Sequence, residues 1–231
     1  MAKGMSISAV IPCYNEENGI SAVLAHNPDS VDEVIVVDNN STDTTAAVAQ
    51  KYGATVVKEP IQGYGAAILR GLHTATKEVV VVLDGDGTYS PKYIPQLATF
   101  LEENNLDFVS ANRFYKGNSN SMPFLNHVGN IILTFFTRLL FRLSLEDSQS
   151  GMFMFKRQLL PELALTSGGM SFSQEIKLAA LANKHIAFAE YPIAYHAASR
   201  IGDKKLRLWH DGFQNLLFLW QRRFTRDRKR N

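Results

Sequence analysis

The feature that most constrains the fold is a regular alternation of short apolar segments and amphipathic segments in the first 113 residues. A segment such as 78–83, with five consecutive apolar residues, is typical of a β-strand that is covered on both faces. Strand–helix repeats of this kind predict an α/β fold with a mostly parallel sheet flanked by helices. The predicted strands are 6–11, 34–37, 54–58, 78–83 and 106–111, and the predicted helices are 16–25, 44–52, 63–74 and 91–103.

The pattern changes after residue 113. A long helix, apolar almost all round, is predicted at 124–143, and its polar interruptions argue against a membrane span of ~20 predominantly apolar residues. The remaining predicted elements are a strand at 152–156 that rejoins the sheet, a helix at 172–183, a strand at 186–191 and an amphipathic helix at 205–224. No low-complexity linker interrupts the chain, so we expect one domain over 1–231 with a C-terminal helical elaboration.

Composition excludes several classes of protein. The chain has 231 residues, of which 45% are hydrophobic and 20% charged, so it is neither disordered nor a low-complexity scaffold. The single cysteine, Cys13, excludes an intramolecular disulfide and fits a reducing compartment, and no secretory signal is visible. The net charge of +2 hides a basic segment at 220–231, which is either a solvated terminus or an arm for an anionic lipid surface or a nucleic acid.

Three polar clusters follow predicted strands, at residues 14–16, 38–43 and 84–86. Ligands of parallel sheets bind beyond the carboxyl ends of the strands, so we expect the three clusters to meet in one cleft. Asp84 and Asp86 flank Gly85, and two carboxylates this close can approach one hard cation such as Mg²⁺ or Mn²⁺. The alternative is a tight turn, because Asp and Gly are both turn formers.

The first two clusters suit a nucleoside. Asp38 ends its strand, where a carboxylate can accept hydrogen bonds from a ribose or a base, and the Tyr14 ring offers an aromatic face. The alternative for both loops is local capping, with Asp38 in an Asx turn and Asn15 as a helix cap. Gly63 and Gly65 do not make a dinucleotide fingerprint, because the third glycine is missing and the pair follows the third strand instead of the first.

Three segments carry a specific resemblance. Val-Ile-Pro-Cys-Tyr-Asn-Glu-Glu (10–17), Val-Val-Asp-Asn-Asn-Ser-Thr-Asp (36–43) and Leu-Asp-Gly-Asp-Gly-Thr-Tyr (83–89) resemble the family 2 glycosyltransferases of the GT-A fold. Ala-Asn-Arg (111–113) and the segments 147–152, 190–193 and 199–206 resemble the branch that includes dolichyl-phosphate mannose and polyprenyl-phosphate glucose synthases. Two departures stand out: the last segment reads Gly-Asp-Lys-Lys where the family has Gly-Glu-Ser-Lys, and the C-terminal transmembrane helices of many relatives are not visible.

The resemblance implies a Rossmann-like GT-A domain with a nucleotide-sugar-binding half at about 6–113, an acceptor-binding half at about 114–206, and an amphipathic helix with a basic tail at 207–231. It assigns the nucleotide sugar to Pro12, Tyr14, Asn15, Glu16, Asp38, Asn39, Gly65, Asp84, Gly85 and Asp86, the metal to Asp84 and Asp86, phosphates to Arg113, Arg200 and Lys205, and catalysis to Asp86, Arg113 and Asp147.

The implied reaction is an inverting transfer of a hexose from a UDP-glucose or GDP-mannose type donor to a polyprenyl or dolichyl phosphate. A phosphate nucleophile is largely ionised at neutral pH, so Asp147 would orient groups instead of abstracting a proton. The implied location is cytoplasmic, peripheral on an anionic membrane through 124–145 and the C-terminal segment. A membrane-anchoring partner or a homo-oligomer is compatible with this expectation, and no nucleic acid is expected.

Three other functions remain open at this point. A soluble glycosyltransferase with a hydroxyl acceptor would keep the donor site and use Asp147 as a general base. A nucleotidyltransferase would need a Gly-rich, basic loop after the first strand, which residues 12–17 lack. A non-catalytic nucleotide-binding module is disfavoured by the intact pair Asp84 and Asp86.

Overall fold

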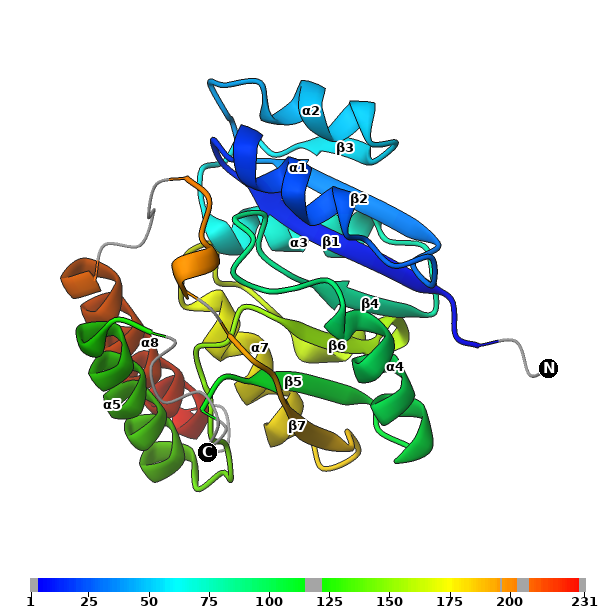
Figure 1. Ribbon diagram of the computed structural model, residues 1–231. Helices are drawn as coiled ribbons and strands as arrows, with labels where there is room; N and C mark the ends of the chain where they lie inside the picture. Colours follow the sequence, from blue (N-terminus) through cyan, green and yellow to red (C-terminus); the bar gives the residue numbers. More distant parts are fainter. Residues whose placement is uncertain (1–3, 115–121, 196, 203–207, 229–231) are drawn as a thin grey trace.

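The computed structural model describes residues 4–114, 122–195, 197–202 and 208–228, which form a sheet of seven strands with helices on both faces (Figure 1). The strands are β1 (Ile7–Cys13), β2 (Glu33–Asp38), β3 (Thr55–Lys58), β4 (Val79–Val82), β5 (Phe108–Asn112), β6 (Phe153–Lys156) and β7 (Phe188–Pro192). The helices are α1 (Glu17–Ala25), α2 (Thr45–Lys51), α3 (Tyr64–Thr74), α4 (Tyr93–Glu103), α5 (Phe124–Phe141), η1 (Arg157–Leu159), α6 (Leu160–Leu163), α7 (Phe172–Ala182), η2 (Ala197–Ser199) and α8 (Leu208–Arg228).

The sheet has the order β3-β2-β1-β4-β6-β5-β7. All neighbouring strands are parallel except β6, which runs antiparallel to β4 and β5. This reversal has a simple cause. The chain leaves β5 at the carboxyl edge of the sheet and forms α5 beyond that edge (Figure 1), so it re-enters the sheet from the same edge. The predicted mostly parallel α/β fold and the predicted strand that rejoins the sheet are both confirmed.

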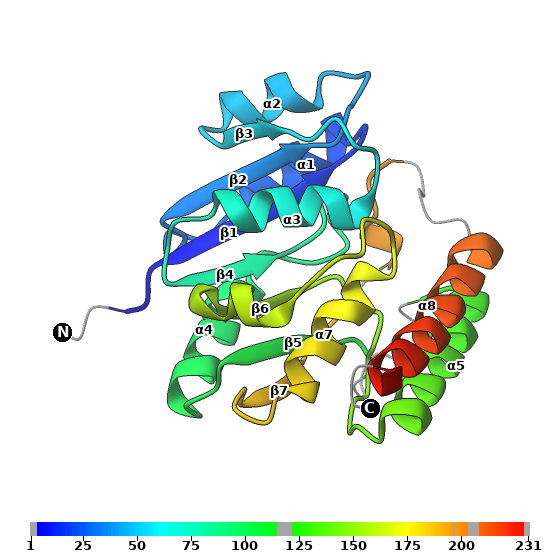
Figure 2. The ribbon, with the colours of Figure 1, turned by 180° about the vertical axis from the view of Figure 1, so that it is seen from behind.

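Two apolar cores cover the two faces of the sheet. The alternation of side chains along β4 sends Val79 and Val81 to one core and Val80 and Val82 to the other. Helices α1, α2 and α4 cover the first face, and α3, α6 and α7 cover the second (Figures 1 and 2). With both faces covered, polar side chains gather at the strand ends, which is where the predicted clusters lie.

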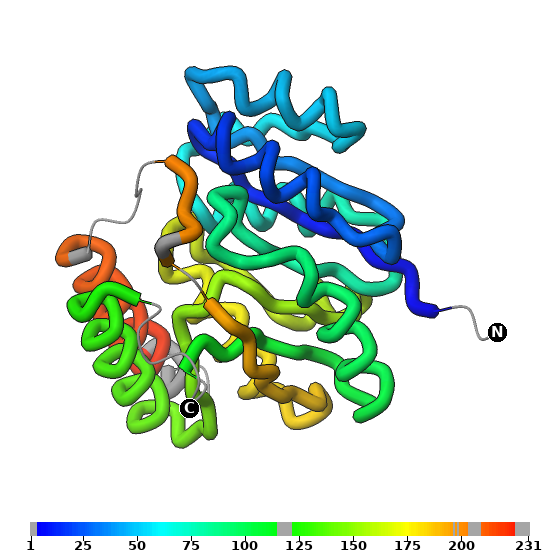
Figure 3. The backbone as a smooth tube through the Cα atoms, in the orientation of Figure 1, coloured from blue at the N-terminus to red at the C-terminus, as the bar shows by residue number. Residues whose placement is uncertain are grey.

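Helices α5 and α8 lie side by side beyond the carboxyl ends of the parallel strands, although residues 142–207 separate them in the sequence (Figure 3). Only Leu133, Thr134 and Thr137 of α5 are buried. Within the described residues, α5 alone is long and apolar enough to cross a membrane by length and composition, with a mean hydropathy of 1.3. Length and composition alone do not test the prediction that its polar interruptions argue against a span, so that stays a prediction.

Most element boundaries lie within two residues of the predicted ones, and the larger differences concern short helices and the C-terminal helix. The short helices η1 and α6 after β6 were not predicted, because seven residues are too few to display a helical period. Helix α8 continues to Arg228, beyond the predicted end at 224, while the predicted start at 205 lies outside the described residues.

Candidate functional site

The three polar clusters converge on the end of β1. The Cys13 thiol is buried there, and burial raises its pKa well above the usual value. The carboxylates of Glu16, Asp38, Asp84 and Asp86 raise this pKa further, because each adds negative charge around the thiol. Residues from three separate loops therefore surround one side chain, as expected for parallel strands whose carboxyl ends share an edge.

Hydrogen bonds tie the first two loops together. The Asn15 side-chain oxygen accepts the backbone N–H of Thr42 at 2.8 Å, and the backbone N–H of Glu16 donates to Thr45 Oγ1 at 2.8 Å. Asn15 holds a left-handed backbone conformation with φ of 52°, which asparagine tolerates better than most residues. These contacts hold the backbone that follows Tyr14 next to the 38–43 loop, and the Tyr14 side chain is exposed.

Asp38 and Asn39 have different local tasks. Asp38 is almost fully buried, and its Oδ1 accepts the backbone N–H of Ser41, three residues further on, at 3.0 Å, a local contact that shapes the turn after β2. The Asn39 side chain makes three hydrogen bonds to the backbone of residues 59–63. The Asn39 amide therefore holds the β3–α3 loop. In Asp38, by contrast, one carboxylate oxygen has no hydrogen bond to another described residue.

Asp84 is the most strongly perturbed carboxyl group of the site. Burial and the neighbouring Asp86 raise its pKa to about 7, against the hydrogen bond that Tyr64 donates at 2.9 Å. Gly151 lies directly beside it: a Cβ at this position would come within 2.9 and 3.1 Å of the two Asp84 carboxylate oxygens. Only a residue without a side chain leaves these oxygens accessible, so the structure gives a physical reason for the glycine.

Asp86 is held from two sides. Its Oδ1 accepts the backbone N–H and the hydroxyl of Thr88 at 3.0 and 2.7 Å, and its other oxygen forms an ion pair with Arg200. Arg200, predicted to bind phosphate, therefore contacts one of the two predicted metal ligands.

The chemistry of these groups fits a divalent cation. Asp84 and Asp86 supply hard oxygen atoms, and the raised pKa of Asp84 reflects the cost of keeping two anions close together in a buried site. A cation between them would remove that cost. Among the described residues no group of three or more His, Cys, Asp or Glu side chains could hold a metal. Mg²⁺ is commonly held by one or two carboxylates together with substrate phosphates, and the pair Asp84 and Asp86 fits that pattern.

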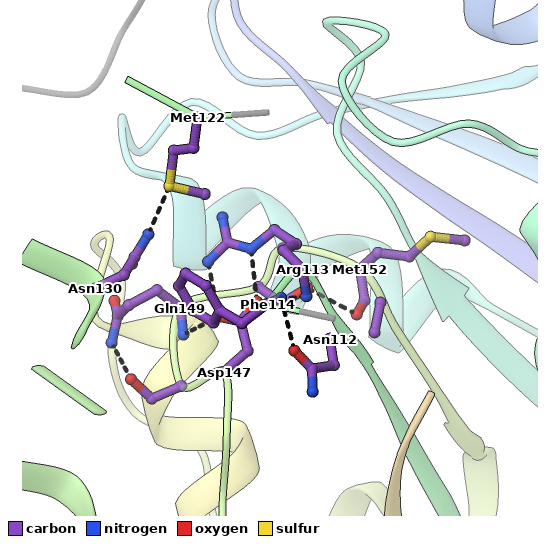
Figure 4. A network of polar contacts seen from close by, with 12 residues as sticks. Asn112, Arg113, Phe114, Met122, Asn130, Asp147, Gln149 and Met152 are labelled. Carbon is purple, nitrogen blue, oxygen red and sulfur yellow. Dashed lines mark hydrogen bonds and ion pairs between the residues drawn. The ribbon is translucent and has the colours of Figure 1, made fainter. Parts of the chain in front are cut away.

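A buried ion pair joins Arg113, at the end of β5, to Asp147 (Figure 4). The Arg113 Nε and Nη2 atoms donate to the two carboxylate oxygens, each at 2.7 Å, and the Arg113 backbone N–H donates at 3.0 Å. Burial alone would raise the pKa of Asp147, but the charge and hydrogen bonds of Arg113 outweigh it and the pKa is lowered. The Arg113 guanidinium also lies 5.3 Å from the centre of the Tyr195 ring.

A pocket of about 470 Å³ starts at these charged residues and extends to the two outlying helices. Its charged end includes Asp84, Arg113 and Arg200. Its far end consists mainly of apolar and amide side chains of α5 and α8, among them Leu125, Asn130, Ile132, Leu133, Trp209, Phe213, Asn215 and Leu216. Asp38, Tyr14 and Asp86 do not line it. The pocket is therefore next to the clustered carboxylates and distinct from the predicted nucleoside loops.

The predicted residues divide into three groups. Asp84, Asp86, Arg113, Asp147 and Arg200 come together around the charged end of the pocket, and Pro12, Tyr14, Glu16 and Asp38 lie at the neighbouring strand ends. Gly65 instead packs against backbone: a Cβ there would overlap the carbonyl oxygen of Ser167. Gly85 is similarly confined by the Cys13 sulfur. Lys205 lies outside the described residues.

Sequence reasoning missed several residues of the site. Tyr64 lies between Gly63 and Gly65, in the segment that does not make a dinucleotide fingerprint, and its position after a predicted strand is the signal that could have identified it. Lys177, a lone cation in the buried helix α7, donates to backbone carbonyl oxygens of the loop that carries Asp147. Glu190 accepts the backbone N–H groups of Glu146 and Asp147 at 2.6 and 2.8 Å.

Relatives with known names support this picture. A dolichyl-phosphate hexose transferase of Haloferax volcanii is 34% identical over 204 residues, which are 87% of this chain and 86% of that protein. A low-salt glycan biosynthesis hexosyltransferase of the same organism is 31% identical over 222 residues, and the matched region is 93% of this chain but 53% of that relative. The chain thus spans about half the length of the second relative.

Solved structures give the same fold. The glucosyl-3-phosphoglycerate synthase of Mycobacterium tuberculosis, in complex with Mg²⁺ and UDP, matches with a TM-score of 0.75 and 26% identity, covering 95% of this chain and 79% of that one. The same enzyme with Mn²⁺, UDP-glucose and phosphoglyceric acid matches with a TM-score of 0.73 and 25% identity, covering 95% and 80%.

The family model described as glycosyl transferase family 2 matches residues 8–164, which is more than half of the chain. The match includes all three polar clusters, β1 to β6, and the Arg113–Asp147 pair. With the α/β architecture of the GT-A glycosyltransferases and the paired aspartates at the end of β4, the conclusion is direct: this chain belongs to glycosyltransferase family 2.

Proposed function

We propose that the protein transfers a hexose, with inversion, from a nucleotide sugar to a polyprenyl or dolichyl phosphate at the cytoplasmic face of a membrane. The observation that carries this proposal is the pocket, which joins the charged residues Asp84, Arg113 and Arg200 to the exposed apolar helices α5 and α8. A phosphate with a long apolar chain has the same two-part chemistry. The name of the 34% identical dolichyl-phosphate hexose transferase of Haloferax volcanii supports this acceptor class.

The donor is proposed to occupy the strand ends beside the pocket. Tyr14 contacts the base, the second oxygen of Asp38 accepts a ribose hydroxyl, and Asp84 and Asp86 hold the divalent cation together with the donor diphosphate. The cation supplies positive charge to the leaving diphosphate. Arg200 adds a second positive charge there, because its guanidinium already lies against Asp86.

The acceptor phosphate is proposed to bind Arg113. A phosphate monoester is largely ionised at neutral pH and needs positioning more than deprotonation. Asp147 then acts by holding Arg113. A role as general base fits the structure poorly, because Asp147 is fully buried, both of its oxygens accept hydrogen bonds from Arg113, and its pKa is lowered.

A turnover assay tests the proposed function. The purified protein with Mn²⁺ is offered UDP-glucose and GDP-mannose, each with a polyprenyl phosphate in detergent micelles or with 3-phosphoglycerate, and products are identified by mass spectrometry. We expect a hexosyl polyprenyl phosphate with one of the two donors. Product only with the water-soluble acceptor would contradict the lipid acceptor.

A second candidate is a transferase with a small phosphorylated acceptor. The structural similarity to a synthase solved with UDP-glucose and phosphoglyceric acid favours it. Transfer to a hydroxyl requires a base, however, and the buried Asp147 would need to leave Arg113 to serve as one. The assay above separates the two candidates.

Donor binding is expected to depend on Asp38. The substitution Asp38→Ala should weaken binding of UDP or GDP by roughly 1–3 kcal/mol, the scale of leaving a buried polar partner unpaired. Calorimetry with both nucleotides in Mn²⁺ measures this. Asp32→Ala is the matched control, because Asp32 accepts the N–H of Ile7 at the opposite end of the same strand pair. Unchanged affinity for both nucleotides would reduce Asp38 to its turn with Ser41.

Membrane attachment is expected through the exposed face of α5 and α8. Their exposed large apolar side chains are Phe124, Leu125, Ile131, Ile132, Phe135, Leu139, Trp209, Phe213, Leu217, Trp220 and Phe224. Apolar contact and basic residues together give reversible attachment, since each cation contributes about 1 kcal/mol near an anionic leaflet. Arg222, counted in the basic tail by sequence, instead pairs with the buried Glu175 at 3.3 Å.

Vesicle co-sedimentation measures this attachment. We expect binding to anionic liposomes that weakens in high salt, because the Debye length is ≈ 8 Å at physiological ionic strength and shorter above it. Phe135→Glu with Leu139→Glu should abolish binding; neither residue lines the pocket. Deleting residues 225–231, which spares Arg222, should weaken it. Tyr52→Glu is the control, because Tyr52 is a similarly exposed aromatic residue directly after α2. Equal binding of all variants would contradict this surface.

A further inference from the structure

Lys177 is a fully buried lysine in the middle of α7. Its Nζ donates to three backbone carbonyl oxygens: that of Ser150 at 2.7 Å and those of Asp147 and Ser148 at 3.3 Å. All three belong to residues 146–151, here called the 146–151 loop, which connects α5 to β6. The Lys177 side-chain nitrogen thus donates to half of the carbonyl groups of a single short loop.

The same loop is fixed from its other side. Glu190 on β7 accepts the backbone N–H groups of Glu146 and Asp147, and the Tyr89 hydroxyl accepts that of Gly151 at 2.7 Å. The backbone amides are therefore held by a carboxylate and a phenol, and the carbonyls by Lys177. A loop without regular structure is immobilised in this way by side chains from three distant segments.

The position of this loop determines the position of Arg113. Asp147 receives both side-chain hydrogen bonds of the guanidinium, so a displacement of the loop moves Arg113 on the pocket wall. Gly151, at the other end of the loop, lies against the carboxylate of Asp84. The loop therefore extends from Arg113, which is proposed to bind the acceptor phosphate, to Asp84, which is proposed to bind the metal.

Packing alone does not explain a lysine here. Burying an ammonium group is costly, and an apolar side chain of similar volume is often neutral or stabilising at such a position. Phe172 and Ile176 belong to an apolar core, but Lys177 lies on another face of the helix, with the buried polar residues Ser173 and Gln174 one turn before it. What a lysine provides, and methionine does not, is a set of N–H donors for the 146–151 loop.

We propose that Lys177 is a positioning residue for the transfer reaction: by clamping the 146–151 loop it holds Asp147, and through Asp147 it sets the Arg113 guanidinium where the acceptor phosphate binds. This inference rests on the proposed function for the role of Arg113. It assigns to Lys177 its main effect on the acceptor, because Asp38 and Tyr14 lie on separate loops and Asp84, which the 146–151 loop only borders, is hydrogen-bonded by Tyr64 of α3.

The test compares Lys177→Met, which keeps the length and removes the donors, with the wild type. The KM for a short-chain prenyl phosphate is expected to rise about tenfold or more, because small misplacements of a positioning group are amplified in rate and affinity. The Kd of UDP in Mn²⁺ should stay within about twofold. Lys156→Met is the control: Lys156 forms a 2.8 Å ion pair with Asp107 at the other end of β6.

A double-mutant cycle separates positioning from general loosening. If Lys177 acts through Arg113, Lys177→Met adds little to the loss already caused by Arg113→Lys. Multiplicative losses in the double variant would overturn the proposal. So would an unchanged acceptor KM in Lys177→Met, or a UDP Kd that rises in parallel with that KM. Lys177→Gln, which retains donor hydrogens, is the second variant, and failure of both variants to fold would assign Lys177 to stability alone and overturn it as well.

The proposed function and this inference fail in different ways. A wild-type protein that turns over 3-phosphoglycerate and not prenyl phosphate contradicts the lipid acceptor. The KM values of the wild type and Lys177→Met are then compared with 3-phosphoglycerate, because its phosphate also requires a cation. Turnover of prenyl phosphate by the wild type with equal KM in Lys177→Met contradicts the role of Lys177 and leaves the acceptor intact. A wild type inactive with both acceptors contradicts both.

Discussion

Replacing Asp86 by asparagine is expected to lower the transfer rate at least ~10²-fold, the scale of removing one preorganised group that stabilises charge in the transition state. Asparagine retains an oxygen that can accept the hydrogen bonds of Thr88, so the turn after β4 is kept while one negative charge is lost. Asp84→Asn should give a similar loss, because it removes the second carboxylate from the cation. Steady-state rates over a range of Mn²⁺ concentrations measure both effects.

Two controls keep this result interpretable. Asp107→Asn removes a carboxylate at the amino end of β5, far from the pocket, and should leave the rate unchanged. Thermal unfolding of each variant reports whether the fold is retained. Full activity of Asp86→Asn, or full activity of the wild type in excess EDTA, would disprove the metal assignment.

The positions of strands and helices could be predicted because burial leaves a local pattern. The apolar run at 78–83 gives β4, and the alternation of its side chains fits a sheet that is covered on both faces. The order of the strands could not be predicted in this way. The insertion of β6 between β4 and β5 depends on contacts between residues more than 40 positions apart, which no local pattern records.

The carboxylates of the site were also predictable, for a topological reason. Asp38 and Asp84 end parallel strands, so the sheet brings them together whatever their separation in the sequence. Tyr64 and Lys177 could not be assigned, because a hydroxyl at a helix start and a lysine within an apolar helix have many possible partners. Asn39 shows the converse: its position suggested ligand contact, but its amide is used within the protein.

The Arg113–Asp147 pair leads to the other large expected effect. Asp147→Asn is expected to lower the free energy of unfolding by about 3–5 kcal/mol, because it leaves the buried guanidinium without its counter-charge. For a chain of this size that lowers the unfolding midpoint by on the order of 10 °C. Asp107→Asn is the matched control: its partner Lys156 is partly exposed, and such pairs contribute about 0–1 kcal/mol.

A double substitution separates stability from catalysis at this pair. Arg113→Met with Asp147→Leu removes both charges at once, and apolar replacement of a buried pair is often neutral or stabilising, so much of the lost stability should return. Activity should not return, since the acceptor phosphate has lost its cation. A double variant that is stable and inactive would show that the pair is kept for the reaction despite its cost to the fold. Wild-type turnover in the double variant would contradict the placement of Arg113 in the acceptor site. An unchanged unfolding midpoint in Asp147→Asn would contradict the contribution of the pair to stability.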